Sequence, residues 1–299
     1  MLAVILFSYM RPELTQAAIQ RCLNWSEDFR LFVSIDGLRN NASNVEATDR
    51  KQVVQIAEVF AQMDRRVEPV VWNSNTGLTN HAERIMSKAF SEFNQVISIE
   101  EDNFCESEGF SFLAEHSNSE EPSIACAYSR FSHVSEVKYR TSYFPAQWGV
   151  ALNRGFFEKF LLVRTQKKID ESVVRNAVES LHSKNSSRLN YVVEYWNMLF
   201  HSAMEHPSHG DALFQYTAMK LNRPFRVSAK SLIKDLGHTD HRGMHERNLR
   251  DREERSHYFR GVEGSSFCIP CERDGSRYGL SRLSRRTYES LYYTLKSRR

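Results

Sequence analysis

The sequence predicts an α/β fold in which helices cover both faces of a mostly parallel central sheet. In the N-terminal third, short apolar runs rich in β-branched residues alternate with longer segments that have helical spacing. These runs are apolar throughout, as is typical of parallel strands that are buried on both faces. The 299 residues, of which 41% are hydrophobic and 26% charged, suffice for one large domain or two modest ones.

Apolar runs mark the strands, and a helical segment or a turn follows each of them. The expected N-terminal strands are Ala3–Phe7, Leu31–Ile35, Val67–Trp72 and Val96–Ile99. Pro12 opens the first helix, because proline suits the first helical position. Apolar residues at helical spacing predict a second helix over residues 44–63. Asp36-Gly37 is a turn signal, and Thr79 is the expected N-cap of the third helix.

The second part of the chain is less regular. It contains an expected strand at Ile124–Tyr128, an aromatic segment at Tyr143–Leu152, a loop at Ser183–Ser187, and helices at Gly155–Leu162, Asp170–Lys184, Tyr191–Met204 and Asp211–Leu221. Beyond about Asp240 the sequence is charged and loop-like. We therefore expect one α/β domain over residues 1–240, with halves at about 1–104 and 105–240, and a charged extension over residues 241–299.

Composition narrows the class of protein. A net charge of +3 is too small to argue for a nucleic-acid partner. No apolar run approaches the ~20 residues of a membrane span, and Met1–Tyr9 is expected to be a strand rather than a signal peptide. The odd number of scattered cysteines favours a reducing cytoplasm. The five cysteines are Cys22, Cys105, Cys126, Cys268 and Cys271.

Three consecutive acids end the fourth predicted strand. Glu100, Glu101 and Asp102 follow the run Val96–Ile99 directly. An isolated buried carboxylate is very costly to desolvate, so we expect the acids at the edge of the sheet, facing solvent, a cation or both. Acids at the carboxyl end of a parallel strand often hold Mg²⁺ or Mn²⁺ with the phosphates of a nucleotide. A solvated loop is the alternative.

Polar residues follow the other predicted strands as well. Ser8, Asp36 and Asn75 stand at or just beyond the ends of the first three strands. In a parallel sheet these ends share one edge, where ligands bind. Together with Asp102 they predict a binding site at that edge.

Five short motifs occur in a characteristic order. They are Ser8-Tyr9-Met10-Arg11, Val33-Ser34-Ile35-Asp36-Gly37, the segment Gly77–Arg84 with His81, Glu100-Glu101-Asp102, and Phe144-Pro145 with Trp148-Gly149. This order resembles GT-A fold glycosyltransferases, namely bacterial members of glycosyltransferase family 2 and the N-acetylglucosaminyltransferase I family. The resemblance spans roughly residues 3–245. It departs at Glu101, where the families usually have Asp.

The resemblance implies a site for a nucleotide-sugar donor, with a UDP-sugar favoured. The implied donor-binding residues are Ser8, Tyr9, Arg11, Asp36, Asn75, His81, Glu100, Glu101 and Trp148. Arg11 would pair with phosphate, and Asp36 would accept a hydrogen bond from the imide N–H of uracil. The alternatives are a ligand-free turn for Asp36, a structural role for His81 and surface charge for Glu100.

The resemblance also implies a metal and a catalytic base. Asp102 would bind Mn²⁺ or Mg²⁺, and His238 is a candidate for a further ligand. Asp211, at the start of an expected helix, would take the proton from an acceptor hydroxyl in an inverting transfer. Its alternative role is that of a helix N-cap. Glu194 is the second candidate for the base.

The sequence thus predicts a metal-dependent, inverting glycosyltransferase that uses a nucleotide-sugar and a saccharide or other hydroxyl acceptor. A sugar-nucleotidyltransferase is one alternative. That class usually has a glycine-rich loop after the first strand, but residues 8–12, which occupy this position here, contain no glycine. A non-catalytic nucleotide- or sugar-binding module is the other.

Cys268 and Cys271 form a lone CxxC, which is weak evidence for zinc. The basic, partly apolar stretch Arg282–Arg299 is expected to be a solvated helix, with contact to the inner membrane face as the alternative.

Overall fold

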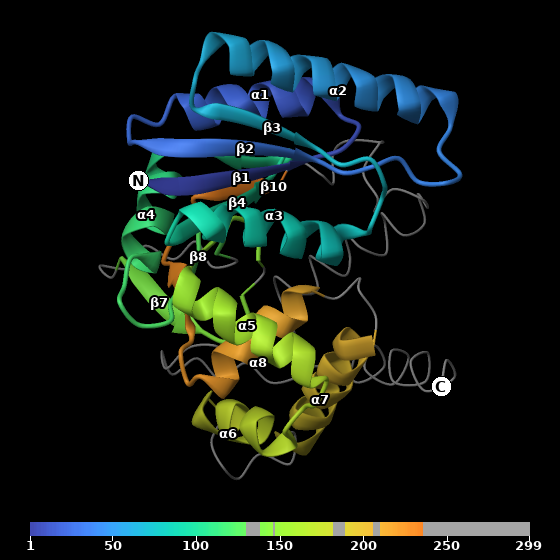
Figure 1. Cartoon of the computed structure of the whole chain (residues 1–299). Helices are drawn as coiled ribbons and strands as arrows, with labels where there is room; N and C mark the ends of the chain where they lie inside the picture. Colours follow the sequence, from blue (N-terminus) through green and yellow to red (C-terminus); the bar gives the residue numbers. More distant parts are fainter. Residues whose placement is uncertain (130–137, 146, 182–188, 206–209, 236–299) are drawn as a thin grey trace.

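The protein folds around an eight-stranded mixed sheet with helices on both faces (Figure 1). The computed structural model describes residues 1–129, 138–145, 147–181, 189–205 and 210–235. The predicted α/β class, with a central sheet dominated by parallel strands, is confirmed. The expected loop at Ser183–Ser187 and the charged extension over 241–299 lie outside the described residues.

The elements have the following bounds. The strands are β1 (Leu2–Ser8), β2 (Phe29–Ile35), β3 (Val67–Val71), β4 (Gln95–Glu100), β5 (Asn103–Cys105), β6 (Ile124–Cys126), β7 (Tyr139–Ser142), β8 (Val150–Asn153), β9 (Phe225–Ser228) and β10 (Ile233–Asp235). The helices are α1 (Pro12–Leu23), α2 (Asn44–Met63), α3 (Leu78–Glu92), α4 (Ser107–Ser117), α5 (Arg154–Gln166), α6 (Glu171–Leu181), α7 (Leu189–Glu205) and α8 (Gly210–Lys220).

The parallel half of the sheet places its strand ends together. The order in the large sheet is β3-β2-β1-β4-β8-β6-β9-β7. β1 pairs in parallel with both β2 and β4, so that Ser8 lies opposite Ile35 and Phe7 opposite Glu100. The chain first builds outward from β1 through β2 to β3 and then returns to place β4 on the other side of β1. The point where the order reverses therefore lies between β1 and β4.

One antiparallel strand separates the two groups of parallel strands. β8 pairs antiparallel with β4 and with β6, so β6 runs in the same direction as β4. Val150 of β8 lies opposite Ser98 of β4 on one side and Cys126 of β6 on the other. Since neighbouring strands lie ~4.8 Å apart, the carboxyl ends of β4 and β6 reach the same edge of the sheet on the order of 10 Å apart.

Residues of β1 alternate between two apolar cores. Ala3, Ile5 and Phe7 pack in the core formed with α3 and with α5 to α8. Leu2, Val4 and Leu6 pack in the core formed with α1, α2 and α4. Figure 1 shows α1 and α2 on one side of the sheet and α5 to α8 on the other. Burial on both faces explains why the strand sequence is apolar at every position.

Several expected boundaries change in the structure. Thr79 is not the N-cap of α3, because the helix begins at Leu78 and Gly77 occupies the cap position with a φ of 77°. Glycine adopts positive φ without a steric penalty, so the helix starts before the threonine, which is buried. β6 ends at Cys126 rather than Tyr128. The short elements β5, α4, β7, β9 and β10 were not expected from the sequence pattern.

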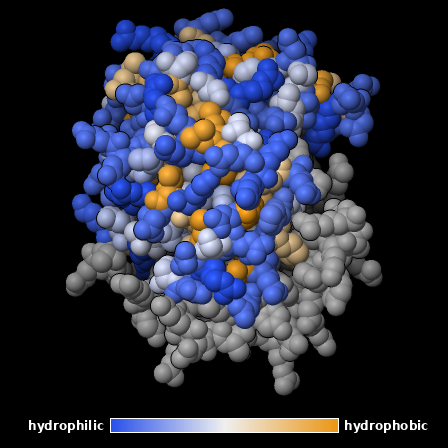
Figure 2. Space-filling view, turned by 60° about the horizontal axis from the view of Figure 1, so that its bottom comes forward, coloured by the Kyte–Doolittle hydropathy of each residue, from blue (hydrophilic) through white to orange (hydrophobic). Residues whose placement is uncertain are grey.

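Among the described helices, none combines the length and the apolar character that crossing a membrane requires. Figure 2 shows one face of the molecule, where hydrophobic residues reach the surface in small clusters between hydrophilic ones.

Two loops at the carboxyl edge touch through their backbones. A Cβ atom at Gly37, just after β2, would lie 2.1 Å from the carbonyl carbon of Ser74, which follows β3. Only glycine allows this approach, because backbone atoms cannot move aside as a flexible side chain would.

We predict that Gly37→Ala destabilises the protein by about 2 kcal/mol or more, in the range of steric strain in a packed region. The free energy of unfolding is measured by urea denaturation. Gly155→Ala is the matched control. The nearest atom to its added Cβ would lie at 3.6 Å, so we expect it to be neutral or to stabilise α5 slightly. Equal stability of the two variants would contradict the packing described here.

Candidate functional site

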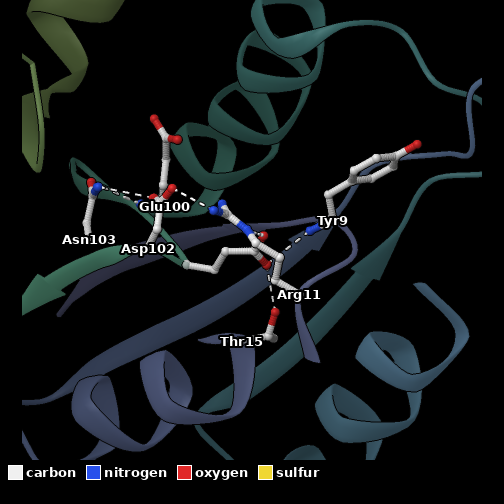
Figure 3. A network of polar contacts seen from close by, with 7 residues as sticks. Tyr9, Arg11, Thr15, Glu100, Asp102 and Asn103 are labelled. Atoms are coloured by element: carbon white, nitrogen blue, oxygen red, sulfur yellow. Dashed lines mark hydrogen bonds and ion pairs between the residues drawn. The ribbon is translucent and has the colours of Figure 1, made fainter. Parts of the chain in front are cut away.

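Arg11 joins the chain segments that leave β1 and β4. Its Nε donates to Glu101 Oε1 at 2.6 Å, and its Nη1 donates to Asp102 Oδ2 at 2.8 Å (Figure 3). Burial lowers the pKa of Arg11, but the two carboxylates outweigh this effect and raise it above its ordinary value. The guanidinium is therefore charged, and the contact lies at the point where the strand order reverses.

Glu101 is the buried member of the acid triplet. It is 2% exposed, and its Oε2 accepts hydrogen bonds from Thr15 Oγ1 at 2.7 Å and from the backbone N–H of Tyr9 at 3.2 Å. Burial raises the pKa of Glu101, while Arg11 and these donors act in the opposite direction. The three acids were expected to face solvent, a cation or both, and Glu101 faces a cation, the guanidinium of Arg11, rather than solvent.

The other two acids point in different directions. Asp102 is 8% exposed, and its Oδ1 accepts from the side-chain amide of Asn103 at 3.3 Å. Glu100 is partly exposed and extends away from the Arg11 guanidinium (Figure 3). Because side chains alternate along a strand, Glu100 lies on the same face as Val96, which packs in the core with α3 and α8.

Asp36 and Asn75, two residues predicted to bind the nucleotide, are hydrogen-bonded to each other. Asn75 Nδ2 donates to Asp36 Oδ2 at 2.9 Å and to the carbonyl of Gly37 at 2.9 Å. Asp36 Oδ1 accepts from the N–H of Gly37 at 2.8 Å. Arg50 supports the turn through a 2.7 Å bond from its Nε to the Asp36 carbonyl. A carboxylate oxygen has a second lone pair, so Asp36 can still accept from a ligand.

Tyr9 follows β1 at the same edge. Its hydroxyl accepts from the backbone N–H of Arg39 at 3.3 Å, and the Arg39 guanidinium lies 5.5 Å from the centre of its ring. Figure 3 shows the ring extending away from the acids. Tyr9 thus lies between the acid contact and the loop that follows Asp36.

His81 is part of the packed interior. It is 3% exposed, and its Nε2 lies 2.6 Å from Ser34 Oγ, which also accepts from the indole N–H of Trp72 at 3.0 Å. Phe7 packs edge-on against its ring. Burial, as the largest effect, lowers the pKa of His81 to about 4. The ring is therefore neutral near pH 7, and its surroundings fit the structural alternative named for it above.

Two buried hydroxyl groups near this edge have no hydrogen-bond partner in the described part of the chain. They are Ser8 Oγ, at the end of β1, and Thr76 Oγ1, in the loop before α3. Ser8 is only 4% exposed. A buried hydroxyl without a partner is costly, so Ser8 has the character of a group that a ligand would satisfy.

Asp211 lies on the same edge, at the start of α8. The surrounding protein desolvates its carboxyl and raises the pKa to about 6, although solvent reaches the side chain. Burial raises the pKa of Cys126 to about 12, and the nearby Asp211 carboxylate adds to this rise. Asp211 lies near the edge where β4 and β6 end, because Gln147, which precedes the first residue of β8 by three positions, contacts its backbone. Gln147 Nε2 holds the Asp211 carbonyl at 2.7 Å.

A pocket of about 300 Å³ lies beside Asp211, between α3, α5, α7 and α8. Trp196 of α7 lines it, whereas Glu194, the second candidate base, is exposed on the same helix and does not line it. Trp148 lies apart from this pocket and packs edge-on against Tyr128, with ring centres 4.3 Å apart. The full lining is Leu78, Thr79, Ala82, Glu83, Met86, Phe160, Trp196, Leu199, Asp211, Ala212, Phe214 and Gln215.

The acids at the edge fit a divalent cation that takes few ligands from the protein. Within the described residues, no group of three or more His, Cys, Asp or Glu side chains is placed to hold a metal ion. Asp102 nevertheless supplies oxygen donors of the kind that Mg²⁺ and Mn²⁺ prefer, and such ions commonly take only one or two carboxylates besides phosphate and water. His238 lies outside the described residues.

Sequence reasoning missed Thr15 and Gln147. Thr15 lies on the inner face of α1 with Ala18 and Ile19, and a polar residue on that apolar face was an available signal. Gln147 sits inside the Phe-Pro to Trp-Gly motif, but nothing in its sequence context pointed to Asp211.

No family model and no curated protein matches the chain. Similar solved structures include a mannosyltransferase from Pyrobaculum calidifontis in complex with GDP-Man and Mn²⁺. It is 8% identical, with a TM-score of 0.41, over 74% of this chain and 70% of that chain. Another is residues 1–349 of S. aureus TarS in complex with UDP-GlcNAc, which is 10% identical, with a TM-score of 0.37, over 74% of this chain and 92% of that chain.

A third similar structure is the 4-diphosphocytidyl-2C-methyl-D-erythritol synthase of Anaerococcus prevotii. It is 10% identical, with a TM-score of 0.35, over 66% of this chain and 82% of that chain. The similar structures thus include glycosyltransferases, the class that the sequence resemblance names. At these identities and TM-scores, the likeness does not by itself assign a function to the chain.

We predict that Arg11→Met lowers the free energy of unfolding by about 3–5 kcal/mol, because it leaves Glu101 buried without its cation. Urea denaturation near pH 7 measures this loss. Lys230→Met is the control, since Lys230 pairs with Glu108 at the exposed surface, where a pair contributes about 1 kcal/mol or less. The double variant Arg11→Met, Glu101→Gln should recover part of the loss. Equal losses for Arg11→Met and Lys230→Met would contradict the buried ion pair.

Proposed function

We propose that this protein is a metal-dependent glycosyltransferase that moves a sugar from a nucleotide-sugar donor to a hydroxyl acceptor with inversion. The observation that carries the proposal is the arrangement at the carboxyl edge of the sheet. The contact of Arg11 with Asp102 lies where the strand order reverses, which is the usual ligand position in open α/β sheets. Asp211 lies along the same edge with a raised pKa.

The donor is assigned to the side of β1, β2 and β3. Asp36, held by Asn75, accepts a hydrogen bond from the base, with the N–H of a uracil favoured. Tyr9 lies between this turn and the acids, where the ribose and phosphates are expected. The guanidinium of Arg11 is a planar donor suited to phosphate. A Mn²⁺ or Mg²⁺ ion at Asp102 would offset the charge that develops on the departing diphosphate.

Asp211 is proposed as the general base. Its carboxylate takes the proton from the acceptor hydroxyl, the hydroxyl oxygen forms the new bond to the anomeric carbon, and the nucleotide diphosphate leaves with the bonding electron pair. A pKa of about 6 suits this role, because the group is ionised at neutral pH yet basic enough to accept a proton. Asp211 lies in the first turn of α8, where a negative charge stabilises the helix. This structural role is compatible with the role of general base.

His238 remains a predicted further ligand of the metal. β10 pairs antiparallel with β5, and Asp235 lies opposite Asn103, one residue from Asp102. We also propose a cytoplasmic location and retain peripheral membrane contact through the C-terminal stretch as the alternative.

The two acids should fail in different ways. We expect Asp102→Asn to lower nucleotide release from the preferred sugar donor by about 10²-fold or more, and to weaken Mn²⁺-dependent nucleotide binding. We expect Asp211→Asn to keep donor binding but to lower transfer by about 10²–10⁴-fold, because the proton acceptor is lost. A panel of nucleotide-sugars with Mn²⁺ or Mg²⁺ identifies the donor.

The control for both variants is Asp28→Asn, an exposed residue in the loop before β2, which should behave as the wild type. A different outcome would support a non-catalytic binding module. In that case Asp102→Asn loses donor binding, and the wild type releases nucleotide from none of the donors.

The rate of transfer should rise with pH through about 6 and level off above 7. The reason is that Asp211 must be deprotonated, so below its pKa of about 6 each pH unit should lower kcat/KM about tenfold. The measurement is a pH profile of kcat/KM with saturating metal. Asp211→Glu should move the inflection, and Asp28→Asn should not. A profile that is flat between pH 5 and 8 would rule out Asp211 as the base.

A further inference from the structure

The pocket beside Asp211 has an unusual lining for a sugar-binding site. Eight of its twelve lining residues are apolar or aromatic, among them Met86, Phe160 and Phe214. Leu78 lies at its rim with 54% of its surface exposed. Because carbohydrate hydroxyls need many hydrogen-bond partners, a site built for a bare sugar would present more polar groups.

The polar groups of the pocket are few, and two are already engaged. Glu83 forms an ion pair with Arg164 of α5. Gln215 donates from Nε2 to the carbonyl of Pro145 at 3.2 Å. Asp211 is the proposed base. The remaining polar groups of the lining are the hydroxyl of Thr79 and the carboxyl of Asp211.

Trp196 forms part of the wall of the pocket. The residue is 8% exposed, and its Nε1 has no hydrogen-bond partner within the described residues. Its ring is fixed by Phe144, with ring centres 4.3 Å apart, and by Phe200 at 5.5 Å. An indole N–H can only donate, and leaving it buried without a partner is costly. The N–H is enclosed by protein, so Trp196 contributes its ring rather than its donor to the wall of the pocket.

We propose that the acceptor substrate is amphipathic: an apolar group, aryl or alkyl, fills this pocket, and the reacting hydroxyl lies at Asp211. This inference rests on the proposed function in one respect, namely that the ligand is an acceptor substrate. The pocket is inferred to be a ligand site from its lining residues alone. An apolar cavity of ~150 Å³ accommodates one benzene, so about 300 Å³ suits a two-ring system or a short alkyl chain.

A matched ligand series tests the proposal without any donor. Methyl, hexyl, phenyl and naphthyl β-glucosides are titrated into the full-length protein by calorimetry. We expect the affinity to rise at least tenfold from the methyl to the naphthyl or hexyl compound. The aryl and alkyl arms show which apolar shape fits better. An affinity that does not depend on the apolar group would overturn the proposal.

Two variants locate the binding in this pocket. Ala82→Phe places a ring in the cavity and should weaken binding of the naphthyl compound at least tenfold, while Val59→Phe on the exposed face of α2 should have no effect. Trp196→Phe reduces the aromatic wall of the pocket and should weaken binding of the naphthyl compound about fivefold. Circular dichroism shows whether the variants are folded. If Trp196→Phe does not fold, Ala82→Phe still tests the proposal, because Ala82 is only half-buried. Unchanged binding in Ala82→Phe would overturn the proposal.

Transfer assays separate this inference from the proposed function. With the preferred donor, kcat/KM should be at least tenfold higher for the naphthyl than for the methyl glucoside, and Ala82→Phe should remove this preference while donor-only nucleotide release stays unchanged. Donor turnover without an apolar preference would overturn the inference and leave the proposed function standing. Size-dependent binding without turnover of any donor would contradict the proposed function and support the pocket as a ligand site.

Discussion

The contact of Arg11 with Glu101 and Asp102 is the interaction on which the carboxyl edge depends. It joins the segment that leaves β1 to the turn that ends β4, where the strand order reverses. Glu101 can be buried there only because Arg11, Thr15 and the N–H of Tyr9 satisfy its carboxylate. The same guanidinium holds one oxygen of Asp102, so the position of the proposed metal ligand is tied to the stability of the fold.

Three neighbouring acids therefore have three different environments. The alternation of side chains along a strand directs Glu100 to one face, and Glu101 turns inward to the guanidinium. Asp102 remains near the surface of the edge. A sequence motif of consecutive carboxylates is thus partly structural, and its members cannot be expected to respond alike to substitution. Asp211 differs again, because it has no paired cation among the causes of its raised pKa.

Much of the N-terminal half could be predicted. Strands buried on both faces are apolar at every position, and apolar residues recur at helical spacing along the whole of α2. The pairing of Asp36 with Asn75 at one edge follows from the same parallel pattern. The antiparallel strand β8 could not be foreseen, since pairing between Val150 and Ser98 leaves no local signal. The partners of Arg11 lie about ninety residues away, and the cap of α3 depends on the positive φ of Gly77.

The single strand β8 has a consequence for how such a protein can diversify. Its hydrogen bonds to β4 and β6 fix the interval between the carboxyl ends of these two strands, so this interval belongs to the backbone. The residues that line the pocket come instead from α3, α5, α7 and α8. Exchange of helix side chains can then change which molecules are accepted, while the spacing of the strand ends, beside which Asp102 lies, is inherited unaltered.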